Sequence, residues 1–192
     1  NMGAYVDMGI DFTKDFLINL TGRYENYSTF GDAFVYKAST RYKFNNDKAT
    51  IRGSFSTGFR APSLHQENLQ LAQASFLPGG AIQLEGIVNG ASSAAKALGI
   101  PKLKAEKSTN FTLGLGLNPT KNLSFTVDYY NIKVEDRIIL SSKIGGTGDA
   151  NNALDKALAT GGVKRMSFFT NGIDTRTSGL DFVGHYKGIN LG

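Results

Sequence analysis

The chain has 192 residues, no cysteine, no tryptophan and a net charge of +5 at pH 7. The lack of cysteine excludes a disulfide framework, a thiolate metal site and a cysteine nucleophile. The basic residues are spread along the chain, which disfavours nucleic acid as a partner. No apolar run approaches the ~20 residues of a transmembrane helix, so only short, half-apolar strands could cross a membrane.

Alternation of apolar and polar residues dominates the chain and predicts an antiparallel, all-β fold. Seven long strands are expected, at residues 4–12, 16–27, 34–44, 49–58, 106–117, 122–137 and 166–187. The last could instead be a hairpin that turns at residues 172–175. In the sixth strand, Leu123, Phe125, Val127 and Tyr129 form an apolar face. The opposite face is small and polar, which suits solvent or a wet barrel lumen.

The lengths of the connections favour a barrel. Short turns rich in Asn, Asp, Thr and Lys are expected at residues 13–15, 45–47 and 118–122. The alternate connections are longer, modestly at residues 28–33 and strongly at 59–105 and 138–163. Outer-membrane barrels have short turns on one rim and long extracellular loops on the other. Within the long loops, short helices are expected at residues 92–98 and 151–159, ended by Gly99 and Gly161.

Seven strands do not complete such a barrel, because single-chain bacterial barrels have even strand counts. An open sheet would expose two unpaired edges. The first residues lack a signal-peptide pattern and resemble the middle of a strand. The chain is therefore expected to be part of a barrel wall cut from a longer protein.

One strand runs into a distinctive loop entry, where Pro62 must end it because proline has no N–H and restricts the preceding residue. The residues are Gly58, Phe59, Arg60, Ala61, Pro62, Ser63 and Leu64. This passage resembles the strand-to-loop signature of TonB-dependent outer-membrane receptors. Further similar segments follow that family's order, at residues 4–7, 22–31, 36–42, 51–54, 104–110, 127–132, 136–138 and 177–181. Lys104 and Ala105 depart from the pattern, since a proline is common there.

The resemblance implies that residues 1–192 are a partial barrel domain, without the plug domain and the C-terminal strands. Such barrels have 22 strands and a plugged lumen. It further implies uptake of a scarce, bulky ligand, foremost an iron–siderophore complex, across the bacterial outer membrane. The implied partners are outer-membrane lipid, the transported small molecule, and the TonB energy-coupling complex acting through the absent plug.

Other functions stay open. Oligosaccharide, cobalamin or peptide could be taken up by the same mechanism, although the long loops hold few aromatic platforms for a sugar, such as Phe76. A surface adhesin or structural barrel would need no plug. An enzyme is not expected, because no acid/base or nucleophile constellation assembles.

Arginines are the main candidate contacts. Arg60 could touch ligand, but an architectural role at the loop entry is favoured. Arg23 and Arg52, on the polar face, could attract an anion by focusing the field. Pairing with lumen carboxylates or with a plug is the favoured alternative. Ligand contacts are expected from the loops at residues 59–105 and 138–163, since loops on a rigid scaffold carry recognition.

The remaining candidates carry little chemistry. His185 shares a polar face with Asp181, and His65 is the other histidine; one His with one Asp is too few for a metal site, so neither metal nor cofactor is expected. Residues 145–149 lack a P-loop lysine and are interpreted as a flexible loop. Five tyrosines fit an interfacial girdle or, alternatively, core packing, namely Tyr24, Tyr27, Tyr42, Tyr129 and Tyr130.

Overall fold

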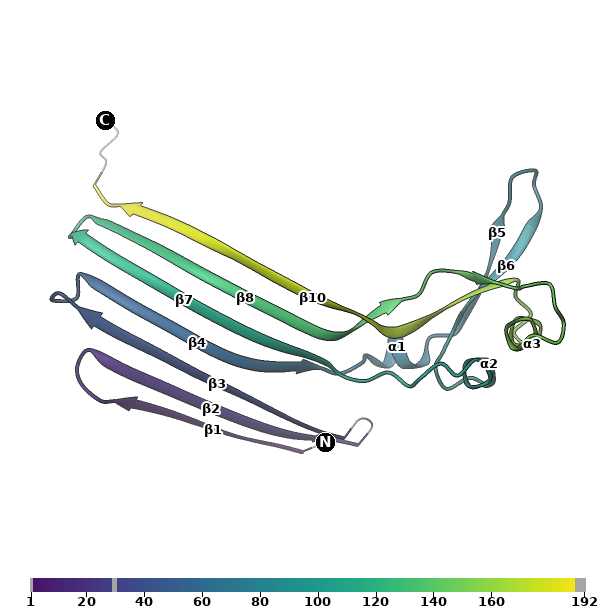
Figure 1. Cartoon of the computed structure of the whole chain (residues 1–192), viewed down its shortest axis with the longest axis horizontal. Coiled ribbons are helices and arrows are strands. Elements are labelled where there is room, and N and C mark those ends of the chain that lie inside the picture. The colour runs from purple at the N-terminus through teal and green to yellow at the C-terminus, as the bar shows by residue number, and fades with distance from the viewer. Residues whose placement is uncertain (1, 29–30, 189–192) are drawn as a thin grey trace. The chain divides into compact units, whose positions relative to one another are not determined.

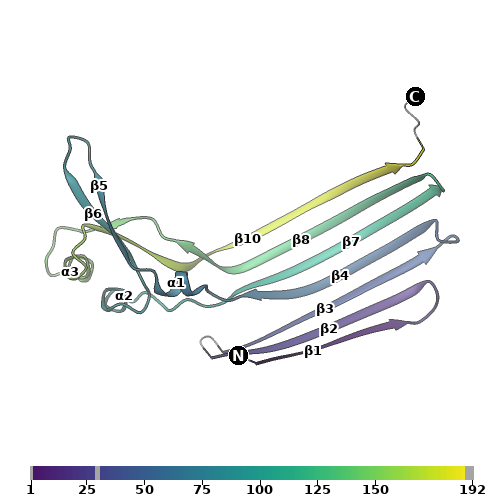
Figure 2. The same cartoon turned by 180° about the vertical axis from the view of Figure 1, so that it is seen from behind.

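The computed structural model describes residues 2–28 and 31–188, mostly as strands (Figures 1 and 2). The chain forms two compact units. The first, the wall unit, draws on residues 1–59, 107–135 and 175–192; the second, the loop unit, comprises residues 60–106 and 136–174. In the described part of the chain, no helix is both long and apolar enough to cross a membrane.

The wall unit is an antiparallel arrangement of long strands that lie side by side in Figures 1 and 2. They are β1 (Met2–Asp11), β2 (Phe16–Tyr27), β3 (Gly31–Phe44), β4 (Ala49–Arg60), β7 (Glu106–Thr120), β8 (Leu123–Leu140) and β10 (Arg165–Tyr186). Their order in the sheet is β1-β2-β3-β4-β7-β8-β10. The seven predicted long strands are therefore confirmed, with ends that differ by up to three residues. The sheet is not closed.

The register separates two faces. In the β1–β2 register, Val6 lies opposite Gly22, Met8 opposite Leu20 and Ile10 opposite Ile18. The apolar face of β1 therefore continues onto β2. Further along the sheet that face carries Leu113 paired with Tyr129, Leu115 with Val127 and Leu117 with Phe125. Many of these side chains are exposed, such as Val6 at 68%. An exposed apolar face backed by a polar one is the pattern of a barrel wall whose outside meets lipid.

Short turns join β1 to β2, β3 to β4 and β7 to β8 at the same end of the wall unit (Figure 1). The β3–β4 turn holds Asn45, Asn46 and Asp47 at φ values of 55°, 53° and 63°. Asn and Asp tolerate this left-handed backbone because their short polar side chains bond locally. At the other end of the strands, β4 and β8 lead into the two long segments, as the sequence predicts.

The loop unit is more structured than expected. It contains α1 (Leu64–Asn68), β5 (Leu71–Phe76), β6 (Ile82–Val88), α2 (Ser93–Ala97), β9 (Ile144–Gly145) and α3 (Ala153–Thr160). The antiparallel β5–β6 hairpin joins the start of β10 through parallel pairing of β6. Its small core consists of Val88, Ala94, Ala157, Leu158, Val163 and Met166.

Two helices were expected, and both are present within about two residues of their predicted bounds. The left-handed residue after α2 is Gly99, as predicted, with φ +67°. After α3 it is Gly162, at φ +64°, whereas the predicted Gly161 is the C-cap and stays right-handed at φ −80°. Both glycines therefore end their helices as predicted, and in α3 the left-handed residue follows one position after the C-cap.

The alternative hairpin within residues 166–187 is wrong, because β10 is one strand from Arg165 to Tyr186. Gly172 in its interior allows close packing: a Cβ there would lie 2.9 Å from the Ile139 side chain of β8. α1, β5, β6 and β9 were not predicted. Sequence signals existed for the first three, since Ser63 and Gln66 form a capping box and a Pro-Gly-Gly turn separates β5 from β6.

Candidate functional site: the polar wall and the loop unit

The Gly58–Leu64 signature is built into the backbone of the loop entry. A Cβ at Gly58 would lie 2.7 Å from the Ser108 hydroxyl, so only glycine fits without displacing that side chain. Pro62 is buried directly after β4 ends, and Ser63 is the N-cap of α1, accepting from the Gln66 amide at 3.1 Å. The signature therefore ends one strand and starts one helix within seven residues.

Arg60 is held by Glu106 rather than free for ligand. Its guanidinium donates from Nε to Oε2 at 2.9 Å and from Nη2 to Oε1. The Glu106 carboxylate also accepts the backbone N–H of Ile138 at 2.8 Å. This side chain is only 8% exposed. One buried carboxylate thus connects the end of β4, the start of β7 and the end of β8.

A second fastening lies where β8 bends. Asp136 has φ +56°, a left-handed conformation that leaves its backbone groups outside the regular ladder. Its N–H donates to the Asp174 carboxylate at 3.0 Å, and its C=O accepts from the Asn171 amide at 2.6 Å. Asn171 also bonds both backbone groups of Lys104. The bend is therefore fixed by side chains of β10.

The polar face of the wall unit carries a bridge between two strands that are not neighbours. Arg52 of β4 binds Asp128 of β8 with Nε–Oδ1 and Nη2–Oδ2 distances of 3.0 and 2.6 Å. β7 lies between them, and its residue at the crossing point is Gly114. A Cβ there would lie 2.1 Å from Asp128 Oδ1, so the bridge depends on the missing side chain.

The same face gathers further cations. Arg41 lies directly opposite Arg52 in the β3–β4 register, and Lys37 is four residues along β3. With serine and threonine hydroxyls they line a hollow of about 260 Å³. Among the described residues no carboxylate is within ion-pair distance of Lys37 or Arg41. Because like charges placed directly opposite destabilise a sheet, this basic patch is suited to an anion.

Arg23 differs from Lys37 and Arg41 because it already has a carboxylate partner. It pairs with Glu25, two residues along the same strand, and the Tyr27 hydroxyl donates to the other oxygen of that carboxylate. Arg23 and Arg52 both contact carboxylates of the wall, whereas Arg41 and Lys37 were not singled out from the sequence. The missing signal was the β3–β4 register, which places Arg41 opposite Arg52 and Lys37 on the same face of β3, and this requires knowing the strand pairing.

In the loop unit a buried carboxylate is flanked by two cations. Glu85 is 5% exposed; its Oε2 lies 2.5 Å from Lys143 Nζ and its Oε1 3.8 Å from Arg165.

The glycine-rich segment at residues 145–149 is held by hydrogen bonds to Asp155. Asp155 accepts from the Thr147 N–H at 2.9 Å and the Thr147 hydroxyl at 2.6 Å. The Thr147 and Gly148 donors hold the pKa of Asp155 below its usual value.

The histidines do not form a site. His65 is an exposed residue of α1, and His185 makes no hydrogen bond or ion pair with Asp181 in the described part of the chain. No cluster of three or more metal-ligating side chains occurs among the described residues.

The tyrosines divide between the two faces. Tyr24, Tyr42 and Tyr129 pair opposite apolar residues on the apolar face, as a girdle requires. Tyr130 lies on the polar face over Gly179, where a Cβ would be 2.5 Å from its hydroxyl. The girdle interpretation is therefore wrong for Tyr130, and also for Tyr27, which shares the polar face of β2 with Glu25, because the alternation of side chains directs both away from the apolar face.

This wall of long antiparallel strands, with short turns at one end and long segments at the other, defines a piece of an outer-membrane type of β-barrel. The sequence model of the family "TonB dependent receptor-like, beta-barrel" matches residues 1–192. The chain belongs to this family. It is an outer-membrane family of Gram-negative bacteria whose members are transporters, not enzymes. They bind ligands such as siderophores and interact with TonB.

Solved structures with the same fold include two siderophore receptors named PirA. The one from Pseudomonas aeruginosa superposes with a TM-score of 0.67 at 19% identity, over 94% of this chain and 30% of that one. The one from Acinetobacter baumannii gives 0.64 at 18% identity, over 96% and 25%. The RagAB peptide importer gives 0.60 at 17% identity, over 95% and 19%. The chain thus spans less than a third of these proteins. No curated protein matches the sequence significantly.

Proposed function

We propose that the protein containing this chain is an outer-membrane importer energised by TonB, and that its ligand is an anionic iron–siderophore complex. The family match supports the transport class, and the fold is shared with structures described as siderophore receptors. The observation that carries the ligand class is the basic patch, where Lys37 and Arg41 stand beside Arg52 with only one carboxylate among them. Field focusing in a polar lumen would concentrate an anion there.

Recognition is proposed to begin in the two long segments, residues 59–105 and 138–163. Their fastenings, Arg60–Glu106 and Glu85–Lys143, support this role because a binding loop gains affinity when it is ordered beforehand. These 192 residues hold no cysteine, so a single cysteine introduced among them can be labelled selectively once any cysteine elsewhere in the whole protein is replaced by serine. A fluorophore at Ala81→Cys or Asp149→Cys should respond to ligand, whereas one at Lys14→Cys in the β1–β2 turn should not.

Transport is tested in cells that lack their own siderophore uptake and that express the whole protein. We expect saturable uptake of radiolabelled iron with a siderophore, and loss of uptake but not of binding when the proton-motive force is collapsed. The double variant Lys37→Gln/Arg41→Gln should bind about 30-fold more weakly, since each lost cation removes about 1 kcal/mol for an anion about 4 Å away at the dielectric constant of water. Lys14→Gln/Lys121→Gln, with the same charge change in two short turns, is the matched control.

A peptide ligand is the second candidate, because the RagAB peptide importer shares the fold. If cells that express the protein accumulate labelled peptides but no iron–siderophore complex, the peptide proposal would replace the siderophore proposal. Equal loss of affinity in both double variants would contradict the role of the basic patch.

A further inference from the structure

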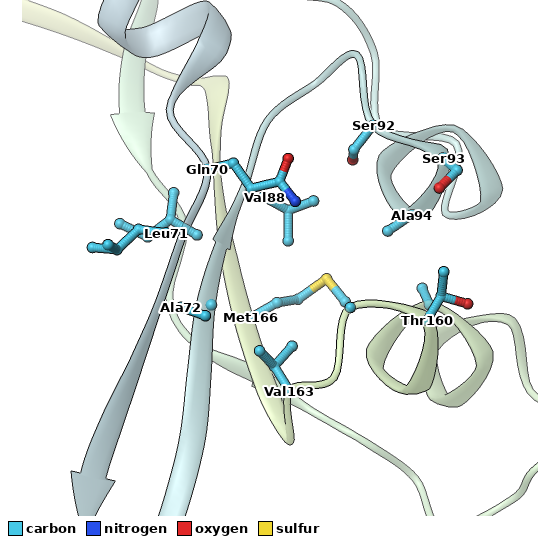
Figure 3. A pocket seen from close by; sticks show the side chains of 14 residues that line it. Gln70, Leu71, Ala72, Val88, Ser92, Ser93, Ala94, Thr160, Val163 and Met166 are labelled. Carbon is cyan, nitrogen blue, oxygen red and sulfur yellow. The ribbon is translucent and has the colours of Figure 1, made fainter.

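The loop unit contains a cavity of about 150 Å³ between the β5–β6 hairpin and the helices α2 and α3 (Figure 3). Met166 lies between Val88 and Val163 at the base of this space, and with only 1% of its surface exposed it borders the cavity at its edge. Ala94 of α2 also borders it. The cavity is therefore framed by the core of the loop unit itself.

The chemistry of the lining is selective. Among the described residues, no charged side chain borders the cavity, although 19% of the chain is charged. The polar groups gather at α2, α3 and the start of β5, where Figure 3 shows Gln70, Ser93 and Thr160 around the apolar middle. In the described part of the chain, Gln70 and Ser93 make no side-chain hydrogen bond. The site thus offers an apolar floor and a hydrogen-bonding rim.

We propose that this cavity binds a small, uncharged aromatic molecule, with its ring on the apolar floor that Leu71 and Ala72 form with the edge of Met166, and a polar substituent at the Gln70–Ser93 rim. A cavity of this volume admits a benzene-sized molecule. A thioether makes favourable contacts with aromatic rings, which favours an aryl ligand over an alkyl one. A charged ligand is selected against, because burying a charge without a partner is costly.

This site is separate in chemistry from the proposed anion site. The basic patch belongs to the wall unit and is lined by cations, whereas the cavity belongs to the loop unit and carries none. The inference does not depend on which ligand the protein transports, or on whether it transports one.

The methionines provide a direct readout. The chain has three, and Met2 and Met8 lie exposed on β1, far along the sequence from Met166. The whole protein, in lipid nanodiscs and labelled with [¹³C-methyl]methionine, is titrated with benzyl alcohol, and Met166→Leu assigns the signal. We expect a saturable ring-current shift of the Met166 methyl with a dissociation constant on the order of 1 mM, as for a fragment-sized ligand. Met2 and Met8 should not shift.

Two controls make the test decisive. Benzoate, with the same ring and a carboxylate, should bind at least about tenfold more weakly because its charge would lack a partner. Ala72→Leu, at the exposed rim of the cavity, should weaken the binding of benzyl alcohol by a similar factor because the larger side chain fills the space. Ala74→Leu, on the same strand but outside the lining, should leave the binding unchanged.

The proposal is overturned by any of three results. The first is a Met166 shift that does not saturate, or that Met2 and Met8 share, which would mean partition into lipid. The second is equal binding of benzoate. The third is unchanged affinity in Ala72→Leu, with correct folding judged from the remaining methyl signals.

Discussion

Replacement of Gly114 by alanine tests how the wall unit is held together across β7. The added methyl would lie 2.1 Å from Asp128 Oδ1 and 2.7 Å from Arg52 Nε, well inside contact distance. Neither atom can stay in place, so the bidentate ion pair between β4 and β8 must open or twist. The backbone itself adds no strain, because Gly114 is not among the positive-φ glycines.

The expected cost follows from the exposure of the pair. Arg52 and Asp128 are 52% and 31% exposed, so their interaction is worth about 1 kcal/mol, at the upper end for a surface pair. Forcing the two side chains off their rotamers adds about 0.5–1.5 kcal/mol. Replacing glycine by alanine also stabilises the protein by about 0.4–1 kcal/mol, because alanine lowers the conformational entropy of the unfolded chain. The net loss in the free energy of unfolding is about 0.5–2 kcal/mol.

The measurement is urea unfolding of the whole protein in lipid, followed by the strand signal in circular dichroism. Gly116→Ala is the matched control, since it lies on the same strand and face with its nearest neighbours at 3.9 Å. It should be neutral or slightly stabilising. In the Arg52→Ala/Asp128→Ala background, Gly114→Ala should lose its cost. An equal cost in that background, or equal stability of the two glycine variants, would refute the role of the bridge.

Further predictions concern the other fastenings. Arg60→Gln leaves the buried Glu106 carboxylate with one donor and should destabilise the loop unit by about 1–3 kcal/mol, visible as faster amide exchange over residues 61–105; exchange that stays unchanged would contradict this. Because the pKa of Asp155 is lowered in the folded protein, its contribution to stability is complete above its usual pKa of 3.8. That contribution is lost as the pH falls through the lower pKa of the folded state. The protection of the amides of residues 147–155 from hydrogen exchange should therefore fall only in acid, and Asp155→Asn should remove this pH dependence. Gly179→Ala should push the Tyr130 ring aside at a cost of about 1 kcal/mol, and Tyr130→Ala should abolish that cost if the collision is its cause.

The sequence alone was enough to predict the wall. Alternation over long segments specifies strands, and it also specifies which face each side chain occupies, because the strand period is two residues. The turn residues between them are local signals as well, since Asn45–Asp47 adopt the left-handed backbone that their side chains tolerate. The Gly58–Leu64 signature was likewise readable, because Pro62 restricts its own backbone and that of the residue before it, and Ser63 caps the helix locally.

The tertiary structure decided which residues meet. Arg60 and Glu106 are separated by 46 positions, and Arg52 and Asp128 by 76, so no local pattern links them. Their contacts depend on strand order and register, which arise from long-range pairing. Arg41 became notable only when the register placed it opposite Arg52. The cavity beside Met166 depends on the same physics, because it forms only when β6, β10 and the two helices pack together.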